Sequence, residues 1–256
     1  MTATYLDRIL EHHRARAAAD IRSFERLLDD AQAMPPTRGF RAALAGRFGV
    51  IAEIKRRSPS KGDLNAGLDA AEMAATYERG GATCLSVLTD EAHFGGSVAD
   101  LQAARAACSL PVLRKDFAVD ERDVLDARLM GADCVLLIAA ALDPQELLAF
   151  HSLAVDIGLD VLVEIHDEDE LGHALTANAR LIGVNQRDLV TFQVDHERAV
   201  RMAGVIPDHA VKVAESGVRN AADAHSLRTA GYDAVLVGET LVTSGDPAAT
   251  IADLLG

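Results

Sequence analysis

Two lysines occupy positions at which they could transfer protons. Lys55 and Lys115 are among only four lysines in a chain that otherwise uses arginine, and each closes a short apolar run. Glu53 lies two residues before the first, and Asp116 directly follows the second. A buried, charged site can bring the pKa of a lysine ammonium toward neutrality, whereas an arginine stays protonated. The positions of the two lysines therefore indicate acid–base chemistry.

Other polar residues stand at or just after the ends of further apolar runs. Glu164 and Asn185 fall at the ends of two such runs, and Glu215 follows a third. If these runs are parallel strands of one barrel, their carboxyl ends meet at one rim, where active sites of this fold lie. Ammonium and carboxylate groups would then share one cavity, which suits proton transfer in both directions.

Small residues after the last two apolar runs predict a phosphate site. Ser216-Gly217 follows the seventh run, and Gly238-Glu239 follows the eighth. In barrels of this kind, backbone N–H groups in these loops often bind phosphate. The basic loop 56–62 comes directly after Lys55 and is expected to close over an anionic ligand.

Eight β-type runs define the predicted fold. Helical patterns lie between them, and several end at or just before glycine, as helix C-termini prefer. The runs are largely apolar rather than alternating, so both faces of the sheet are expected to be buried and the strands parallel. We therefore predict an α/β fold, a single (β/α)8 TIM barrel. A doubly wound open sheet is the alternative, but no glycine-rich nucleotide loop follows any run. The runs are residues 50–55, 84–89, 111–115, 134–139, 161–165, 181–185, 211–214 and 234–237.

An N-terminal segment precedes these units. Residues 5–34 carry apolar side chains at helical spacing and are predicted to form one amphipathic helix, which Pro35-Pro36 ends. A short helical segment is predicted at residues 40–44. We expect a single domain, residues 1–256, in which a helical extension (1–46) precedes the barrel (47–256).

Composition excludes several classes of function. The net charge of −14 argues against a nucleic-acid or anionic-membrane surface, which needs a basic face. No export signal and no membrane span are visible, so a cytoplasmic protein is expected. Cys84, Cys108 and Cys134 are expected to be reduced packing residues. The histidines show no metal-ligand spacing and no P-loop occurs, so neither a metal nor a cofactor is expected.

Short motifs follow one another in a fixed order along nearly the whole chain. They are Ile51-Ala52-Glu53-Ile54-Lys55-Arg56 with Ser58-Pro59-Ser60-Lys61-Gly62, Ser86-Val87-Leu88-Thr89-Asp90 with Phe94 and Gly96-Ser97, Pro111-Val112-Leu113-Arg114-Lys115-Asp116-Phe117, Gly131-Ala132-Asp133 with Leu136-Leu137-Ile138, Leu162-Val163-Glu164, Ile182-Gly183-Val184-Asn185 with Arg187-Asp188-Leu189, and Ala214-Glu215-Ser216-Gly217-Val218. No motif is decisive by itself. Together they resemble the indole-3-glycerol phosphate synthase family of the tryptophan pathway.

This resemblance implies a reaction and a set of site residues. The reaction is ring closure of 1-(2-carboxyphenylamino)-1-deoxyribulose 5-phosphate, with loss of CO2 and water and without a cofactor, to indole-3-glycerol phosphate. Lys115 would be the general acid at the ribulose carbonyl, and Glu164 would stabilise charge or act as a base. The other implied residues are Glu53, Lys55, Asn185 and Glu215 in the polar site, Lys55 and Ser58 near the substrate carboxylate, Phe94, Phe117 and Leu136 against the anthranilate ring, Arg187 at the substrate, and Ser216, Gly217, Gly238 and Glu239 at the phosphate.

The resemblance also sets expectations for partners and for one side chain. The expected partner is the small phosphorylated anthranilate substrate; the net charge already argues against nucleic acid and membrane, and the chain is expected to be a monomer, with a weak dimer as the alternative. Glu239 stands where some relatives have a small polar residue. Its carboxylate is expected to point away from the phosphate, which it would repel, and to leave only its N–H inward.

Two other functions stay open at this point. Phosphoribosylanthranilate isomerase and the tryptophan synthase α-subunit would use the same barrel, but the lysine pair argues against both. The isomerase would also place a cysteine at a strand end, whereas Cys84 begins its run. A paralogue that binds the ligand without turnover is the third hypothesis, and the intact polar positions argue against it.

Overall fold

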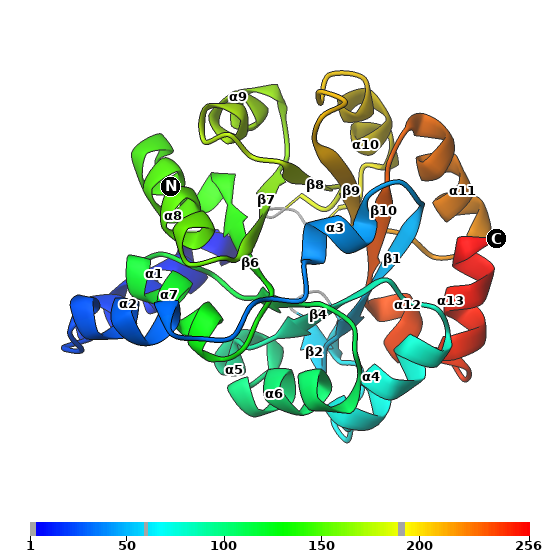
Figure 1. Cartoon of the computed structure of the whole chain (residues 1–256). Helices are drawn as coiled ribbons and strands as arrows, with labels where there is room; N and C mark the ends of the chain where they lie inside the picture. The colour runs from blue at the N-terminus through cyan, green and yellow to red at the C-terminus, as the bar shows by residue number, and fades with distance from the viewer. Residues whose placement is uncertain (1–3, 59–60, 189–192) are drawn as a thin grey trace.

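Eight parallel strands close into a barrel in the computed structural model of the chain, which describes residues 4–58, 61–188 and 193–256. Neighbouring strands pair in parallel around the ring, and β1 completes it by pairing with both β4 and β10 (Figure 1). The predicted barrel is confirmed, and every predicted run falls within one residue of an observed strand at each end. The strands are β1 (Gly49–Ile54), β4 (Cys84–Leu88), β5 (Val112–Lys115), β6 (Cys134–Ile138), β7 (Asp160–Ile165), β8 (Leu181–Asn185), β9 (Val211–Glu215) and β10 (Ala234–Val237).

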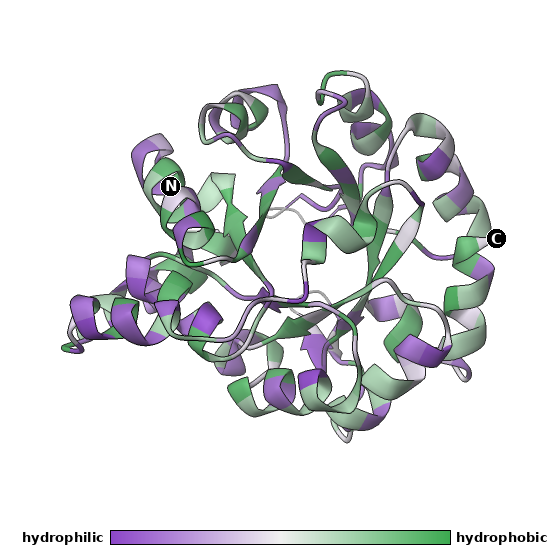
Figure 2. Ribbon diagram, viewed as in Figure 1, coloured by the Kyte–Doolittle hydropathy of each residue, from purple (hydrophilic) through white to green (hydrophobic). Residues whose placement is uncertain are grey.

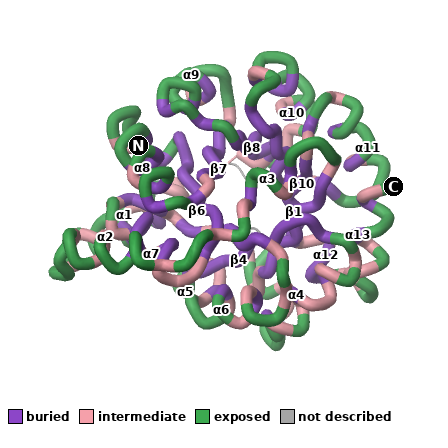
Figure 3. The backbone as a smooth tube through the Cα atoms, viewed as in Figure 1, coloured by how far each residue is buried: buried purple, intermediate pink, exposed green. Residues whose placement is uncertain are grey.

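The strands are apolar on both faces because the barrel interior covers one face and the surrounding helices cover the other. Nearly every strand residue is buried, and the buried segments trace the ring while exposed ones lie outside it (Figure 3). Hydrophobic residues likewise concentrate on the strands and on the helix faces that pack against them (Figure 2).

Outer helices follow the strands, and polar caps fix where they begin. The side chains of Asp69, Ser97, Asp120, Asp143 and Asp167 each accept a hydrogen bond from a backbone N–H in the first turn of the next helix. The predicted helices are confirmed. The outer helices are α4 (Ala70–Arg79), α6 (Val98–Ala107), α7 (Glu121–Leu129), α8 (Pro144–Asp156), α9 (Glu168–Thr176), α10 (His196–Ala203), α11 (Ala221–Ala230) and α13 (Pro247–Leu255), the last of which was not predicted.

Several short elements were also not predicted. A two-stranded hairpin, β2 (Arg57–Ser58) and β3 (Gly62–Asp63), follows β1, and three single turns follow β4, β6 and β10. The turns are α5 (Glu91–Phe94), η1 (Ala139–Ala141) and α12 (Glu239–Val242). No helix in the described part of the chain is long and apolar enough to cross a membrane.

The N-terminal segment forms two helices, so the prediction of one continuous helix is wrong. Helix α1 (Tyr5–Ala18) ends at Ala19, and α2 (Phe24–Gln32) begins anew. The break has a local cause: the Asp20 carboxylate accepts the backbone N–H of Arg22 at 2.9 Å, and the Ser23 hydroxyl accepts that of Arg26 at 3.3 Å. These polar side chains satisfy the backbone groups that a continuous helix would have paired.

Helix α3 (Phe40–Leu44) closes one opening of the barrel. It lies across the centre of the ring in the view of Figure 1. Phe40 and Leu44 are fully buried in one apolar cluster with residues near the strand starts, among them Cys84 and Cys134. The N-terminal end of the barrel is therefore filled, and the opposite end remains for the site.

Candidate active site

A cavity of about 430 Å³ lies at the carboxyl ends of the strands. The two lysines, Lys55 at the end of β1 and Lys115 at the end of β5, both line it. All of the predicted site residues share this cavity: Glu53, Lys55, Ser58, Phe94, Lys115, Phe117, Leu136, Glu164, Asn185, Arg187, Glu215, Ser216, Gly217, Gly238 and Glu239.

Lys115 lies among carboxyl groups from the opposite side of the barrel. Its Nζ donates to Glu164 Oε2 at 3.1 Å and lies 3.7 Å from Glu215 Oε2. Asn185 Nδ2 donates to the other oxygen of Glu164 at 3.0 Å, and the Asn185 oxygen accepts the backbone N–H of Arg187 at 3.0 Å. One continuous cluster of polar side chains is thus formed by residues from strands β5, β7, β8 and β9.

The protonation state of Lys115 differs from the expectation. Burial lowers the pKa of the ammonium, but the neighbouring carboxyl groups, Glu164 first, raise it more, so the pKa of Lys115 lies above the ordinary lysine value. The expectation that the site brings this pKa toward neutrality is wrong. Lys115 is protonated at neutral pH, which is the state that a proton donor requires.

The pKa values of the two carboxyl groups beside Lys115 are shifted in opposite directions. Burial raises the pKa of Glu164, but the charges of Lys115 and His166 and the Asn185 and Lys115 hydrogen bonds lower it overall. Burial and the nearby charge of Glu164 raise the pKa of Glu215 well above its ordinary value, against the opposing effect of Lys115. Glu164 is therefore ionised at neutral pH, whereas Glu215 holds its proton to a higher pH than an ordinary glutamate, and such a divergence separates the base from the acid in many enzymes.

Lys55 and Glu53 form a second ion pair in the cavity. Lys55 Nζ donates to Glu53 Oε1 at 2.5 Å, as expected for residues two apart on a strand. The other Glu53 oxygen accepts the Ser86 hydroxyl at 3.3 Å, which holds the carboxylate in place. Ser58 also lines the cavity, and its buried hydroxyl has no hydrogen-bond partner among the described residues.

Glycines make room for this polar group. A Cβ at Gly183 would lie 2.0 Å from Glu215 Oε1, and one at Gly238 would lie 2.4 Å from Glu53 Oε1. After β9, Ser216 and Gly217 adopt φ values of 66° and 79°. A left-handed serine is strained, and strain of this kind is common at functional sites.

In the described part of the loop after Lys55, two basic side chains form ion pairs with other elements of the chain. Arg56 pairs with Asp100 of α6, and Lys61 pairs with Glu239, while Pro59 and Ser60 lie outside the described residues. Of the three basic residues in the loop, only Lys61 lines the cavity. Glu239 also lines it, and its carboxylate pairs with Lys61, whose positive charge offsets the negative one.

Helix α1 contributes a wall that the sequence motifs did not predict. Tyr5, Leu6 and Ile9 line the cavity from this helix, although they precede every barrel strand. His196 and Arg219 line it as well and were also missed. The sequence did not mark these residues as cavity residues, because the apolar face of a helix does not reveal what it packs against.

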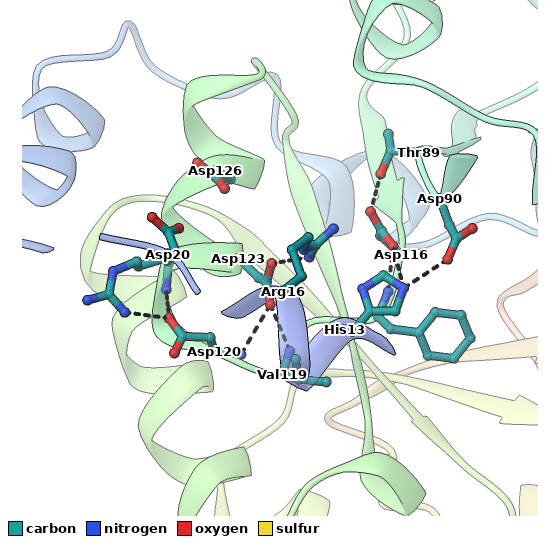
Figure 4. Close-up of polar contacts among 12 residues, drawn as sticks. His13, Arg16, Asp20, Thr89, Asp90, Asp116, Val119, Asp120, Asp123 and Asp126 are labelled. Carbon is teal, nitrogen blue, oxygen red and sulfur yellow. Dashed lines mark hydrogen bonds and ion pairs between the residues drawn. The ribbon is translucent and has the colours of Figure 1, made fainter. Parts of the chain in front are cut away.

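A buried polar cluster anchors α1 beside the cavity. His13 Nε2 lies 2.8 Å from Asp90 Oδ2 and 3.9 Å from Asp116 Oδ1, and Figure 4 shows the ring directed at both carboxylates. Asp90 Oδ2 also accepts His93 Nδ1 at 2.9 Å. His13, Asp90 and His93 have donor atoms within 4.8 Å of one another and could hold a metal ion, a grouping hidden from the sequence because 77 residues separate His13 from Asp90.

Comparisons with solved structures agree on the fold. A thiamine phosphate pyrophosphorylase from Pyrococcus furiosus superposes with a TM-score of 0.61 at 16% identity, covering 84% of this chain and 95% of that one. A 3-hexulose-6-phosphate synthase from Salmonella typhimurium gives a TM-score of 0.64 at 16% identity, with 81% and 96% covered. At this level of identity the likeness concerns the barrel alone.

Comparisons of sequence are more specific. The family model described as "Indole-3-glycerol phosphate synthase" matches residues 6–254. The chain is 52% identical to "Indole-3-glycerol phosphate synthase 2" of Streptomyces coelicolor over 237 residues, 92% of each protein. It is 49% identical to "Indole-3-glycerol phosphate synthase" of Mycolicibacterium smegmatis over 257 residues, 99% of this chain and 94% of the relative. With a family model that spans nearly the whole chain and relatives of about half identity, the chain belongs to the indole-3-glycerol phosphate synthase family.

Proposed function

We propose that Lys115 is the general acid by which this indole-3-glycerol phosphate synthase closes the ring of its substrate. In 1-(2-carboxyphenylamino)-1-deoxyribulose 5-phosphate, the aromatic carbon that bears the carboxylate attacks the ribulose carbonyl. The developing alkoxide needs a proton, and the protonated Lys115 ammonium in the cavity can supply it. Loss of CO2 then restores the aromatic ring without a cofactor.

The two carboxyl groups beside Lys115 have different roles in this proposal. Glu164 is ionised, so it can stabilise positive charge on the nitrogen and accept a proton during dehydration. The pKa of Glu215 is raised well above its ordinary value and its Oε2 lies 3.7 Å from Lys115 Nζ, so its carboxyl can return a proton to the lysine. Asn185 keeps Glu164 oriented through its hydrogen bond.

The two ends of the cavity suit the two ends of the substrate. Phe94, Phe117 and Leu136 provide apolar walls for the anthranilate ring, with Lys55 and Ser58 for its carboxylate. Ser216, Gly217, Gly238 and the Glu239 backbone would bind the phosphate in the loops after β9 and β10, the usual phosphate position in this fold. Arg187 lines the cavity and would bind substrate beside Asn185.

One observation supports this function most directly: two lysines from separate strands share one cavity with three buried glutamates. Incubation with the carboxyphenylamino substrate should produce indole fluorescence. Ligand binding without product would favour the non-catalytic paralogue. Formation of the isomerase product instead would favour phosphoribosylanthranilate isomerase.

We also propose that the chain works as a monomer in the cytoplasm. The small-molecule substrate requires no partner surface. Light scattering on a size-exclusion column would test the oligomeric state, and a mass of two chains would contradict it.

A further inference from the structure

His166 lies directly behind the carboxylate of Glu164. It follows β7, two residues after Glu164, and precedes α9. Its ring is fixed by Glu170 of α9, whose Oε2 accepts both the His166 backbone N–H at 2.7 Å and Nδ1 at 3.1 Å. A carboxylate on Nδ1 requires the proton on that nitrogen, so the tautomer is set.

The other ring nitrogen is unused by the fold. Nε2 is buried and has no hydrogen-bond partner among the described residues, and it lies 3.9 Å from Glu164 Oε1. A bare nitrogen lone pair facing a carboxylate is repulsive, whereas an imidazolium there is attractive. His166 does not line the cavity, so its effect on substrate must pass through Glu164.

We propose that His166, oriented by Glu170, is a positioning residue that holds a positive charge behind Glu164 and keeps this carboxylate ionised in mildly acidic solution. This inference rests on the proposed role of Glu164. Glu170, His166 and Glu164 would then act in sequence: Glu170 orients the ring, and the charge at the buried, unpartnered Nε2 acts on Glu164.

The charged groups around His166 come from several elements and do not all act alike. Burial lowers the pKa of His166, but the Glu170 hydrogen bond and the charge of Glu164 raise it above the ordinary histidine value, while Arg198 of α10 opposes this. On the far side of Glu164, Lys115 of β5 has the largest lowering effect on the carboxylate, and His166 comes next. The pKa of Glu215 of β9 is raised, so this carboxyl adds less negative charge than an ordinary glutamate would. His166 is therefore the second cation of Glu164.

The test compares pH profiles of kcat/KM for wild type, His166→Gln and Glu170→Gln between pH 5 and 9. Removing the cation raises the pH at which Glu164 ionises, so the acidic limb should move up by about one pH unit, a loss of about tenfold below the limb. Above the limb, both variants should approach the wild-type value. His173→Gln is the matched control, since His173 is exposed on the same helix α9.

Two results would overturn the inference. An unmoved acidic limb would show that Glu164 does not sense His166, and an equal loss at every pH would show a merely structural role. NMR titration of the His166 ring gives a readout that does not need turnover, because Glu170→Gln should lower its pKa. Failure of the wild type to make product would instead refute the proposed function, so the two failures are distinguishable.

Discussion

Lys115, Glu164 and Glu215 are neighbouring titratable groups whose pKa values do not all shift in the same direction. The pKa values of Lys115 and Glu215 are raised and that of Glu164 is lowered, although the two buried carboxyl groups lie only 3.1 Å and 3.7 Å from the Lys115 ammonium. Each pKa depends on the charges of the neighbouring groups as well as on burial. A substitution that changes one charge should therefore change the titration of the rest.

Replacement of Lys115 should abolish turnover while substrate binding persists. Lys115→Ala removes the proton donor, and a loss of about 10²–10⁴-fold in kcat is expected for a general acid. Lys115→Arg keeps the charge but should also be poor, because a guanidinium does not release a proton near neutral pH. Steady-state fluorescence kinetics with a separate binding titration measure this, and near-normal turnover of either variant would contradict the role.

Replacement of Glu164 and Glu215 by glutamine should have unequal effects. Glu164→Gln removes the ionised group and should lower kcat about 10²–10⁴-fold. Glu215→Gln removes the carboxyl that can return a proton to Lys115 but leaves Lys115 and Glu164 in place, so its loss should be smaller, about tenfold. Equal losses in the two variants would argue against these different roles.

The pH dependence of stability gives Glu215 a second test. Its folded-state pKa is raised, so its contribution to stability is present below the ordinary glutamate pKa and is lost as the pH rises. Glu215→Gln should therefore gain stability relative to wild type between pH 5 and pH 8. Urea midpoints at the two pH values measure this, and a constant difference would contradict it.

At the scale of elements, α1 forms one wall of the cavity, and the buried His13 is one of the side chains that anchor it, with Arg14 and Arg16. His13→Leu removes the partner of Asp90 and should destabilise the fold by about 1–3 kcal/mol. It should also raise KM several-fold with kcat nearly kept, because Tyr5, Leu6 and Ile9 line the cavity from the same helix. Urea unfolding and kinetics measure the two effects. His225→Leu on α11 is the control, and an unchanged KM would show that α1 does not depend on this anchor.

The hairpin after β1 meets the turn after β10 through Lys61 and Glu239. Glu239→Ser removes a negative charge beside the proposed phosphate site and releases Lys61 for the ligand. The KM and the inhibition constant of inorganic phosphate should both fall severalfold. The control is Lys61→Ala, for which both constants should rise, and a fall in both variants would contradict this arrangement.

The strands and the cavity residues could be predicted from the sequence, because apolar runs with polar carboxyl ends carry a strong signal. The break between α1 and α2 was missed since the helical spacing continues across it, and only Asp20 and Ser23 mark it. The pairing of Lys61 with Glu239, like that of His13 with Asp90, joins residues far apart in the chain. The raised pKa of Lys115 depends on how many carboxyl groups lie near it in the folded chain, and no local sequence pattern shows this number.

For the molecule as a whole, the two ends of the barrel have separate tasks. Phe40 fills the end opposite the cavity, so Phe40→Ala should destabilise the fold by about 3–5 kcal/mol while kcat stays unchanged. Urea denaturation and kinetics measure this. Ile21, which is 98% exposed, provides the control Ile21→Ala with no expected effect. The single-domain organisation, with its extension at 1–46, is a proposal that one cooperative transition in these experiments would support.

Closure of the ring by β1 and β10 has a consequence for synthesis on the ribosome. The first strand of the barrel to leave the exit tunnel pairs along one edge with the last, so that edge stays open until the C-terminal residues emerge. A nascent chain arrested before residue 234 would present two unpaired strand edges and an unsealed apolar interior. Such arrested chains should recruit chaperones or aggregate, whereas release of the full-length polypeptide should end this vulnerability.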